Sequence, residues 1–132
     1  MKKKIKAFTL VELLVVLVII GILVLLALPS LMPLISKAKS TEAKLQLEHI
    51  YTLEKNHFYI HSRFSDDLNE IGFEQIPLTN NGGSANYQVQ ITESSNHTFK
   101  AIATSVVDFD GDGIYNQWEI DQDKKLIEII KD

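Results

Sequence analysis

The uninterrupted apolar run from Phe8 to Leu28 constrains the fold of this chain more than any other feature of the sequence. Of its 21 residues, only Thr9 and Glu12 are neither apolar nor Gly. A helix of this length spans roughly 30 Å, the thickness of the hydrocarbon core of a bilayer. We therefore predict a membrane-spanning helix near the start of the chain.

Glu12 is the anomaly within this run. A charge buried in the middle of a bilayer costs about 2.5–3.5 kcal/mol, and less near its surface, so such residues usually face a partner. The run from Phe8 to Leu28 contains no cation. We therefore expect the partner of Glu12 to lie outside this chain.

Two simple interpretations of the run fit poorly. A secretory signal peptide has an apolar core of about 7–15 residues followed by a small-residue cleavage site. Here the run is longer, and Leu28-Pro29 is a poor cleavage site for the signal peptidase. A plain single-pass anchor fits the length but leaves Glu12 unexplained.

The segment KAFTLVELL, residues 6–14, together with Gly21 and Pro29, resembles the leader and N-terminal helix of type IV pilins and type II secretion pseudopilins. The resemblance implies that a prepilin peptidase cuts between Ala7 and Phe8 at the cytoplasmic face and methylates the new N-terminus. The family usually has Gly where this chain has Ala7, a departure that bears on the efficiency of cleavage.

The same resemblance implies an α+β fold of ladle shape, in which a long N-terminal helix packs on a small antiparallel β-sheet. The expected parts are a cleaved leader (1–7), a transmembrane and filament-core half-helix (8–35), an amphipathic spine (36–60) and a headpiece (61–132). The implied assembly residues are Phe8, Glu12, Gly21 and Pro29. The new amine of Phe8 would meet Glu12 of a neighbouring subunit, and the stretch from Gly21 to Pro29 would lose helical structure in the filament.

The pattern of the second half-helix is amphipathic. Leu47, Ile50, Tyr51 and Phe58 recur at spacings of three and four and form one apolar stripe. We interpret Glu42 and Lys44 as part of a solvated face, since charged residues alternate with this stripe. His57 and His61 have a spacing that can bind a metal on one helical face, but no third ligand is evident, so a solvated or capping pair is the better interpretation.

The headpiece begins with a connection and continues with alternating segments. Ser65 can cap a short helix over 66–71, which Gly72 can end. Alternation predicts a strand from Tyr87 to Thr92 and an antiparallel return over 99–107. Two further strands are expected around Trp118–Ile120 and over Leu126–Ile130, which gives a four-stranded antiparallel sheet.

An acidic motif separates the second and third predicted strands. Residues 108–119, DFDGDGIYNQWE, fit the calcium loop pattern D-x-[DN]-x-[DN]-G-x₅-E over its full length. Calcium takes six to eight oxygen ligands, which closely spaced carboxylates supply. Calcium in this strand connection is also a property of the major pseudopilins that the headpiece resembles. The candidate ligands are Asp108, Asp110, Asp112, Ile114, Asn116 and Glu119.

A second interpretation of this motif is an exposed turn, because Asp and Gly are favoured turn residues. The segments on both sides of the motif have the pattern of strands, whereas an EF-hand has helices there. In this interpretation Glu119 belongs to the third strand and points away from the loop. The chain has no Cys. If bound, a structural Ca²⁺ would replace a disulfide as the clamp on the C-terminal strands.

Charge defines the orientation of the chain and excludes one class of partner. Four of the 13 basic residues, Lys2, Lys3, Lys4 and Lys6, lie in the leader, which places the N-terminus in the cytoplasm. Without them, 9 basic side chains remain against 17 acidic ones. A mature domain this acidic is not expected to bind nucleic acid through a general basic surface.

The function implied by the resemblance is that of a structural subunit of a type IV pilus-like filament, processed by the prepilin peptidase and polymerised through its N-terminal helix. Its partners would be further copies of itself, other pilins, the inner-membrane assembly platform and the lipid bilayer. It would lie in the bacterial inner membrane, with its N-terminus cytoplasmic, and in an extracellular pilus or periplasmic pseudopilus.

Two alternatives remain. One is a type II secretion pseudopilin, although the Tyr-Pro-rich segment of the major pseudopilins is missing between His57 and Gly72. The other is a membrane-anchored calcium-binding module that never polymerises, which an intact Met1 terminus would favour. We expect no enzyme, because the sequence shows no Ser/His/Asp set, no phosphate-binding loop and no convincing His-rich metal site.

Overall fold

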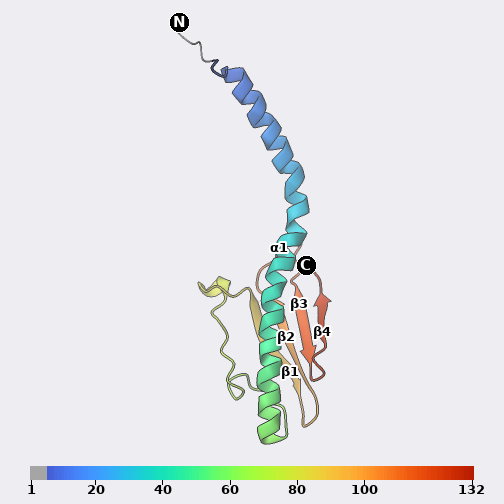
Figure 1. Ribbon diagram of the computed structural model, residues 1–132. Helices are drawn as coiled ribbons and strands as arrows, with labels where there is room; N and C mark the ends of the chain where they lie inside the picture. The colour runs from blue at the N-terminus through green and yellow to red at the C-terminus, as the bar shows by residue number, and fades with distance from the viewer. Residues whose placement is uncertain (1–5) are drawn as a thin grey trace. The chain divides into compact units, whose positions relative to one another are not determined.

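The computed structural model describes residues 6–132. Most of the predicted leader, including Lys2, Lys3 and Lys4, therefore lies outside the described residues. Figure 1 shows one long helix and a β-sheet, with a short 3₁₀ turn between them. The elements are α1 (Leu10–His61), η1 (Thr79–Asn81), β1 (Tyr87–Ser94), β2 (Phe99–Ser105), β3 (Gln117–Asp121) and β4 (Leu126–Ile130). The chain divides into two compact units, and α1 runs from the first, which ends at Leu34, into the second, which begins at Ile35.

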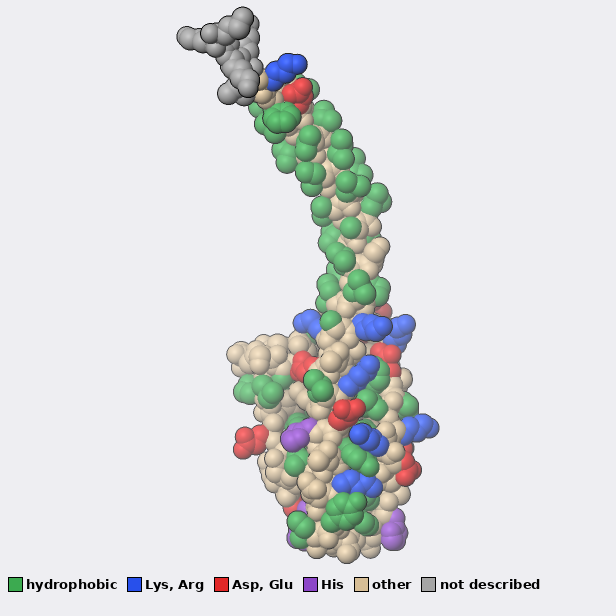
Figure 2. Space-filling view, viewed as in Figure 1, with side chains coloured by type: hydrophobic (Ala, Val, Ile, Leu, Met, Phe, Trp, Pro, Cys, Tyr) green, Lys and Arg blue, Asp and Glu red, His purple; other side chains and the backbone are tan. Residues whose placement is uncertain are grey.

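The first unit is the apolar part of α1. By length and composition this part could cross a membrane, and none of its most apolar 18-residue window is buried. Figure 2 shows hydrophobic side chains over the visible face of this part of α1. Pro29 and Pro33 lie inside α1 and do not end it. The predicted long apolar helix is confirmed.

In the second unit, one face of α1 packs against the sheet. The buried helix residues recur every three or four positions and include the predicted Leu47 and Ile50; the full set is Ser40, Ala43, Leu47, Ile50, Glu54 and His57. Tyr51 and Phe58 are half-buried beside this core. The predicted stripe is therefore correct, but the buried face also contains three polar residues, Ser40, Glu54 and His57.

The sheet is an antiparallel meander in the order β1-β2-β3-β4. Alternate residues of β2 from Phe99 to Ser105 are buried, and Ala101 and Ala103 belong to the same core cluster as the buried apolar residues of α1. Tyr87 and Val89 of β1 and Ile120 of β3 complete this core. The four predicted strands and the α+β fold class are thus confirmed.

The short helix expected over 66–71 is wrong, because this segment forms turns. The Ser65 hydroxyl accepts a bond from the Asp67 amide at 3.0 Å, and the Asp67 carboxylate accepts one from Asn69 at 2.8 Å. Side-chain bonds of this kind compete with the helical backbone pattern. Gly72 does end the segment, with a left-handed φ of 79°.

The interpretation of Glu42 and Lys44 as a solvated face is also wrong. The Glu42 carboxylate accepts bonds from the Asn86 amide and the Asn86 side chain, both at 2.8 Å, and from the Tyr87 amide at 3.3 Å. The ammonium group of Lys44 lies over the Trp118 ring, 4.5 Å from its centroid. Both side chains therefore tie the spine helix to the sheet.

Candidate functional site

The start of α1 carries a capping box built from Thr9 and Glu12. The Thr9 amide donates to Glu12 Oε2 at 2.8 Å, and the Glu12 amide donates to Thr9 Oγ1 at 3.3 Å. In this motif a Thr at the cap and a Glu three residues later satisfy each other's backbone donors. Glu12 therefore has a hydrogen-bond donor within its own chain, but this donor is a neutral amide, and the expected charged partner outside the chain stays a prediction.

The other residues predicted for processing and assembly lie in exposed positions. Ala7 and Phe8 precede α1 in an exposed, non-helical segment. A side chain built at Gly21 would meet no atom of the described residues within 4 Å. Pro29 lies within the helix.

The acidic motif gathers its three Asp residues and adds a fourth. Asp108, Asp110, Asp112 and Asp132 each offer a carboxylate oxygen, and these four oxygens lie within 4.8 Å of one another. Asp108 is held by the amides of Gly111 and Gly113, which donate at 2.6 and 2.7 Å. Both glycines have a left-handed φ, which brings their amides to the carboxylate with little strain.

Asp132 closes the cluster from the end of the sheet. Its Oδ2 accepts a bond from the Phe109 amide at 2.9 Å, and its backbone oxygen accepts one from the Ser36 hydroxyl at 2.9 Å. Its Oδ1 is buried and finds no hydrogen-bond partner among residues 6–132. One buried carboxylate oxygen of the cluster is thus left without a donor.

Two carboxylates of the cluster, those of Asp108 and Asp110, have shifted pKa values. The Gly113 amide, followed by other loop amides, lowers the pKa of Asp108. The Asp112 amide also lowers the pKa of Asp110, but desolvation and the charges of Asp112, Asp132 and Asp108 outweigh it, so that pKa is raised. The loop therefore concentrates negative charge that a cation would neutralise.

The remaining candidate ligands are engaged elsewhere or make other contacts. Glu119 lies in β3, and its carboxylate is 3.9 Å from the Lys100 ammonium. Asn116 is fully buried and accepts a bond from the Tyr87 hydroxyl at 2.7 Å while donating to Glu128 at 2.6 Å. Ile114 donates its amide to Asp112 at 2.7 Å.

The four Asp oxygens have a spacing compatible with a calcium ion, but they supply only part of the six to eight ligands that this ion takes. With Ca²⁺–oxygen distances of about 2.3–2.6 Å, ligands on opposite sides of an ion are separated by about 5 Å, close to the spread of the cluster. The unpartnered oxygen of Asp132 is a ready ligand of this kind. Backbone carbonyls and water would complete the shell.

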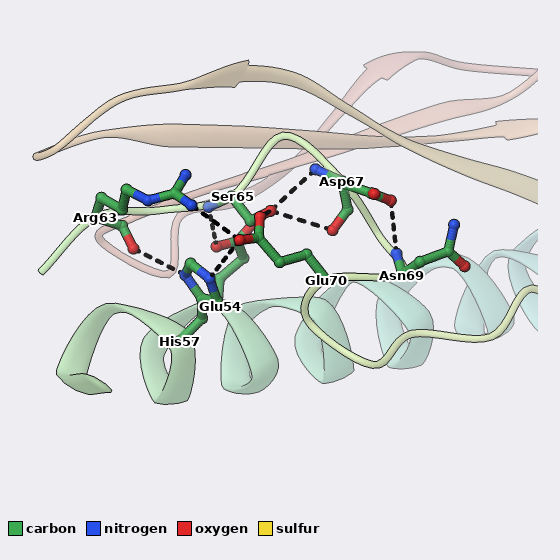
Figure 3. A network of polar contacts seen from close by, with 7 residues as sticks. All are labelled: Glu54, His57, Arg63, Ser65, Asp67, Asn69 and Glu70. Carbon is green, nitrogen blue, oxygen red and sulfur yellow. Dashed lines mark hydrogen bonds and ion pairs between the residues drawn. The ribbon is translucent and has the colours of Figure 1, made fainter. Parts of the chain in front are cut away.

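A second polar cluster lies at the other end of the spine, and the sequence analysis missed it. Figure 3 shows Glu54 and His57 on α1 facing Arg63, Ser65 and Glu70 of the following connection. Glu54 is fully buried; its Oε2 accepts a bond from the Ser65 amide at 3.0 Å, and its Oε1 finds no partner in the described part of the chain. Desolvation is the main reason that the pKa of Glu54 is raised, despite the Ser65 bond that lowers it.

His57 is buried and His61 is exposed, so the interpretation of the two as a solvated or capping pair is wrong in its solvated form for His57 and correct for His61. The Nδ1 atom of His57 lies 2.9 Å from the Arg63 carbonyl oxygen, and its Nε2 lies 3.4 Å from Glu70 Oε1. Arg63 donates to the same Glu70 oxygen at 2.9 Å, and Ser65 donates to the other oxygen of that carboxylate. Those contacts, with the Ser65 hydroxyl first, lower the pKa of Glu70.

The fold is that of a protein with one long helix and a small antiparallel headpiece. The helix is apolar and exposed in its first part, begins with a capping box, and continues into the core of the headpiece. Residues 2–28 match the family described as a prokaryotic N-terminal methylation motif. The chain is 31% identical over 105 residues to a fimbrial protein of Pseudomonas aeruginosa, with 75% of the chain and 67% of that protein covered. The chain therefore belongs to the type IV pilin family.

Another relative is the type IV major pilin protein PilA of Myxococcus xanthus (strain DK1622). The two are 44% identical over 68 residues, which make up 52% of this chain. The match covers 31% of the length of the Myxococcus protein.

Proposed function

We propose that this chain is a structural, non-catalytic subunit of a type IV pilus-like filament, processed by the prepilin peptidase and polymerised through its N-terminal helix. The observation that carries the proposal is the exposed apolar part of α1, which begins two residues after Phe8. The relatives described as a fimbrial protein and a type IV major pilin support the same role.

In this proposal, the subunit is held in the inner membrane by the apolar part of α1 until an assembly platform extracts it. The apolar helices then exchange lipid contacts for contacts with other pilin subunits. Cleavage before Phe8 creates a positively charged amine close in sequence to Glu12. That amine would pair with Glu12 of a neighbouring subunit, which neutralises a buried charge and sets the axial register.

Processing is tested by intact mass and N-terminal sequencing of the protein from its native membrane and from sheared surface filaments. The expected chain begins at a methylated Phe8 and is present in the sheared fraction. A chain that still begins at Met1 in both fractions would refute the proposal and leave an anchored module that does not polymerise.

The role of Glu12 is tested with variants that separate its charge from its cap. Glu12→Gln keeps an acceptor for the Thr9 amide but removes the charge, whereas Thr9→Val removes the hydroxyl and keeps the charge. We expect Glu12→Gln and Glu12→Leu to lose filaments while the headpiece stays folded, and Thr9→Val to retain them. Normal filaments from Glu12→Leu would refute the assignment.

We further propose that the four-Asp cluster binds a structural Ca²⁺ that clamps the loop before β3 to the end of β4. Asp108, Asp110, Asp112 and Asp132 would hold the ion, and the unpartnered oxygen of Asp132 supports their fit to it. The ion would supply positive charge where the loop has none and would have no chemical role. Ile114, Asn116 and Glu119 of the sequence motif would not be required as side-chain ligands.

The calcium proposal is tested by thermal unfolding of the full chain in detergent with and without 10 mM CaCl₂. With the dissociation constant of about 0.1–1 mM typical of extracellular modules, the ion stabilises the fold by about 1.4–2.7 kcal/mol. Asp110→Asn should abolish this gain, whereas Glu119→Gln, outside the cluster, should keep it. Equal unfolding midpoints of the wild type with and without calcium would refute the proposal.

A further inference from the structure

The connection from α1 to β1 lies beside β1, which is an edge strand of the sheet (Figure 1). It is bonded to this edge at two places. The Phe64 amide donates to the Ser95 carbonyl oxygen at 3.1 Å, just after the end of β1. The Gln75 side chain accepts a bond from the Val89 amide at 3.0 Å and donates to the Tyr87 carbonyl oxygen at 3.1 Å. Gln75 therefore takes the place of a neighbouring strand at the start of β1.

Between these two places a groove lies along the edge of β1. It consists of two adjoining hollows, which share Leu68 and Asn69 and are lined on the strand side by residues 88–91. The amide of Val89 points to this side, and the alternation along an antiparallel strand gives the Ile91 amide the same direction. No loop bond of the described chain reaches that amide. The groove therefore combines apolar side chains with an open strand edge.

The charged residues of the groove are all acidic. Asp66 and Asp67 line one hollow and Glu74 lines the other, and all three are exposed. Among residues 6–132, none of them forms an ion pair, and no Lys or Arg lines either hollow. A ligand that fits this groove should carry positive charges beside apolar groups.

β4, the edge strand on the opposite side of the sheet, has this complementary character. Lys125 and Lys131 flank it, and both are exposed and form no ion pair in the described part of the chain. Its acid, Glu128, binds the buried Asn116. A free edge strand with exposed β-branched residues can pair with another chain. The exposed residues of this kind in β4 are Ile127, Ile129 and Ile130.

We propose that the groove beside β1 binds β4 of a second copy of this chain, so that neighbouring headpieces join edge to edge. This inference rests on the proposed function, in which subunits polymerise. The four strands alternate in direction, so β4 runs antiparallel to β1 in neighbours that have the same orientation. An interface between two different surfaces of one chain can continue into a filament, whereas identical surfaces close into a dimer.

The antiparallel direction also specifies the charge pairs. The hollow with Asp66 and Asp67 lies further along β1 than the hollow with Glu74. Lys125, before β4, would therefore meet Asp66 and Asp67 of the second copy. Lys131, after β4, would meet Glu74 of that copy.

Thiol cross-linking tests this contact directly, because the chain has no Cys. Asn69→Cys places one thiol in the groove and Ile129→Cys places one on β4, both at exposed positions. Sheared filaments of the double variant are treated with a short thiol-reactive cross-linker and separated by denaturing electrophoresis. We expect a ladder of linked subunits, while each single variant should give single subunits only.

A matched pair of thiols controls for chance encounters between subunits. Asn69→Cys combined with Glu48→Cys keeps the groove thiol and places the other on an exposed position of α1 instead of β4. This pair should give no ladder. A ladder as strong as that of Asn69→Cys with Ile129→Cys would overturn the proposal.

Charge reversal tests the pairing in the cross-linking variant. Lys125→Glu with Lys131→Glu brings like charges together and should lower the yield of linked subunits about tenfold. Adding Asp66→Lys with Glu74→Lys reverses the groove as well and should restore the yield. A yield that charge reversal leaves unchanged would overturn the proposed pairing.

The outcomes separate this inference from the proposed function. Filaments of the double variant whose subunits stay unlinked would overturn the inference alone. Linked dimers of Ile129→Cys by itself would show that two β4 edges meet each other, which also overturns it. A wild-type chain that forms no filaments would refute the proposed function and this inference with it.

Discussion

Removal of the Glu42 carboxylate should destabilise the headpiece strongly, although Glu42 is only half-buried. The carboxylate accepts three bonds from Asn86 and Tyr87, at the point where β1 begins. Glu42→Ala leaves those donors without their partner. Glu48→Ala is the matched control, because Glu48 is an exposed acid on the same helix.

The magnitude follows from the number and exposure of these bonds. A hydrogen bond to a charged group contributes about 1.5–3 kcal/mol, but water replaces part of the loss at a half-buried site, so we expect about 2 kcal/mol in total. For a domain of roughly 100 residues this lowers the unfolding midpoint by about 8–16 °C. Glu48→Ala should stay within about 0.5 kcal/mol of the wild type.

The assay is thermal unfolding of the full chain in detergent, followed by the fluorescence of Trp118, the single tryptophan, which lies half-buried in β3. Urea unfolding provides an independent value of the free energy. If Glu42→Ala and Glu48→Ala have the same midpoint, the carboxylate does not anchor β1, and the argument from its three bonds is refuted.

Three further substitutions test other contacts. Gly83→Ala should destabilise the loop before β1 by several kcal/mol or displace it, because the new Cβ would lie 1.9 Å from the Pro77 carbonyl oxygen; unchanged urea unfolding would contradict this. Tyr87→Phe should lower the free energy of unfolding by about 1–3 kcal/mol, because Asn116 Oδ1 loses the Tyr87 hydroxyl that donates to it at 2.7 Å. A decrease below about 0.5 kcal/mol, measured by calorimetry, would contradict this. Glu54→Gln tests pH dependence. The pKa of Glu54 is raised in the fold, so the wild type gains stability from this group at low pH and loses it as the pH rises through the folded value. The stability of Glu54→Gln relative to wild type should therefore be higher at pH 8 than at pH 5, and a pH-independent difference would exclude this cause.

Local patterns predicted the elements of this fold well. The alternation of Tyr87, Val89 and Ile91 has the period of a strand, and β1 covers those residues. The spacing of Leu47 and Ile50 has the period of a helix with one buried face. Such patterns depend only on near neighbours in sequence, which is why they can be interpreted without a structure.

Contacts between distant residues could not be predicted in the same way. Glu42 binds Asn86, which lies 44 residues further on, and nothing near Glu42 signals that bond. The calcium loop pattern indicated Glu119 as the last acid, whereas the fold brings Asp132 to the loop, because β4 returns antiparallel to β3.

Two features did leave a signal in the sequence. Thr9 and Glu12 have the T-x-x-E spacing of a capping box, directly at the start of an apolar helix. Glu54 follows Ile50 by four residues and therefore lies on the apolar stripe, a position where an acid indicates a buried polar contact. In both cases an acid, Glu12 or Glu54, occupies a position in an otherwise apolar pattern.

The order of strands has a consequence for how the headpiece is completed during synthesis. Each strand hydrogen-bonds only to the strands before and after it in the chain, so a new strand joins a free edge as it emerges and displaces nothing. β4 is made after β1, β2 and β3, and the segment that contains it brings Glu128 to Asn116 and Asp132 to the acidic loop. A chain truncated before Leu126 would keep three strands with an open edge, and its acidic loop would lack the fourth carboxylate. Residues 126–132 therefore emerge after both Asn116 and the acidic loop that they contact.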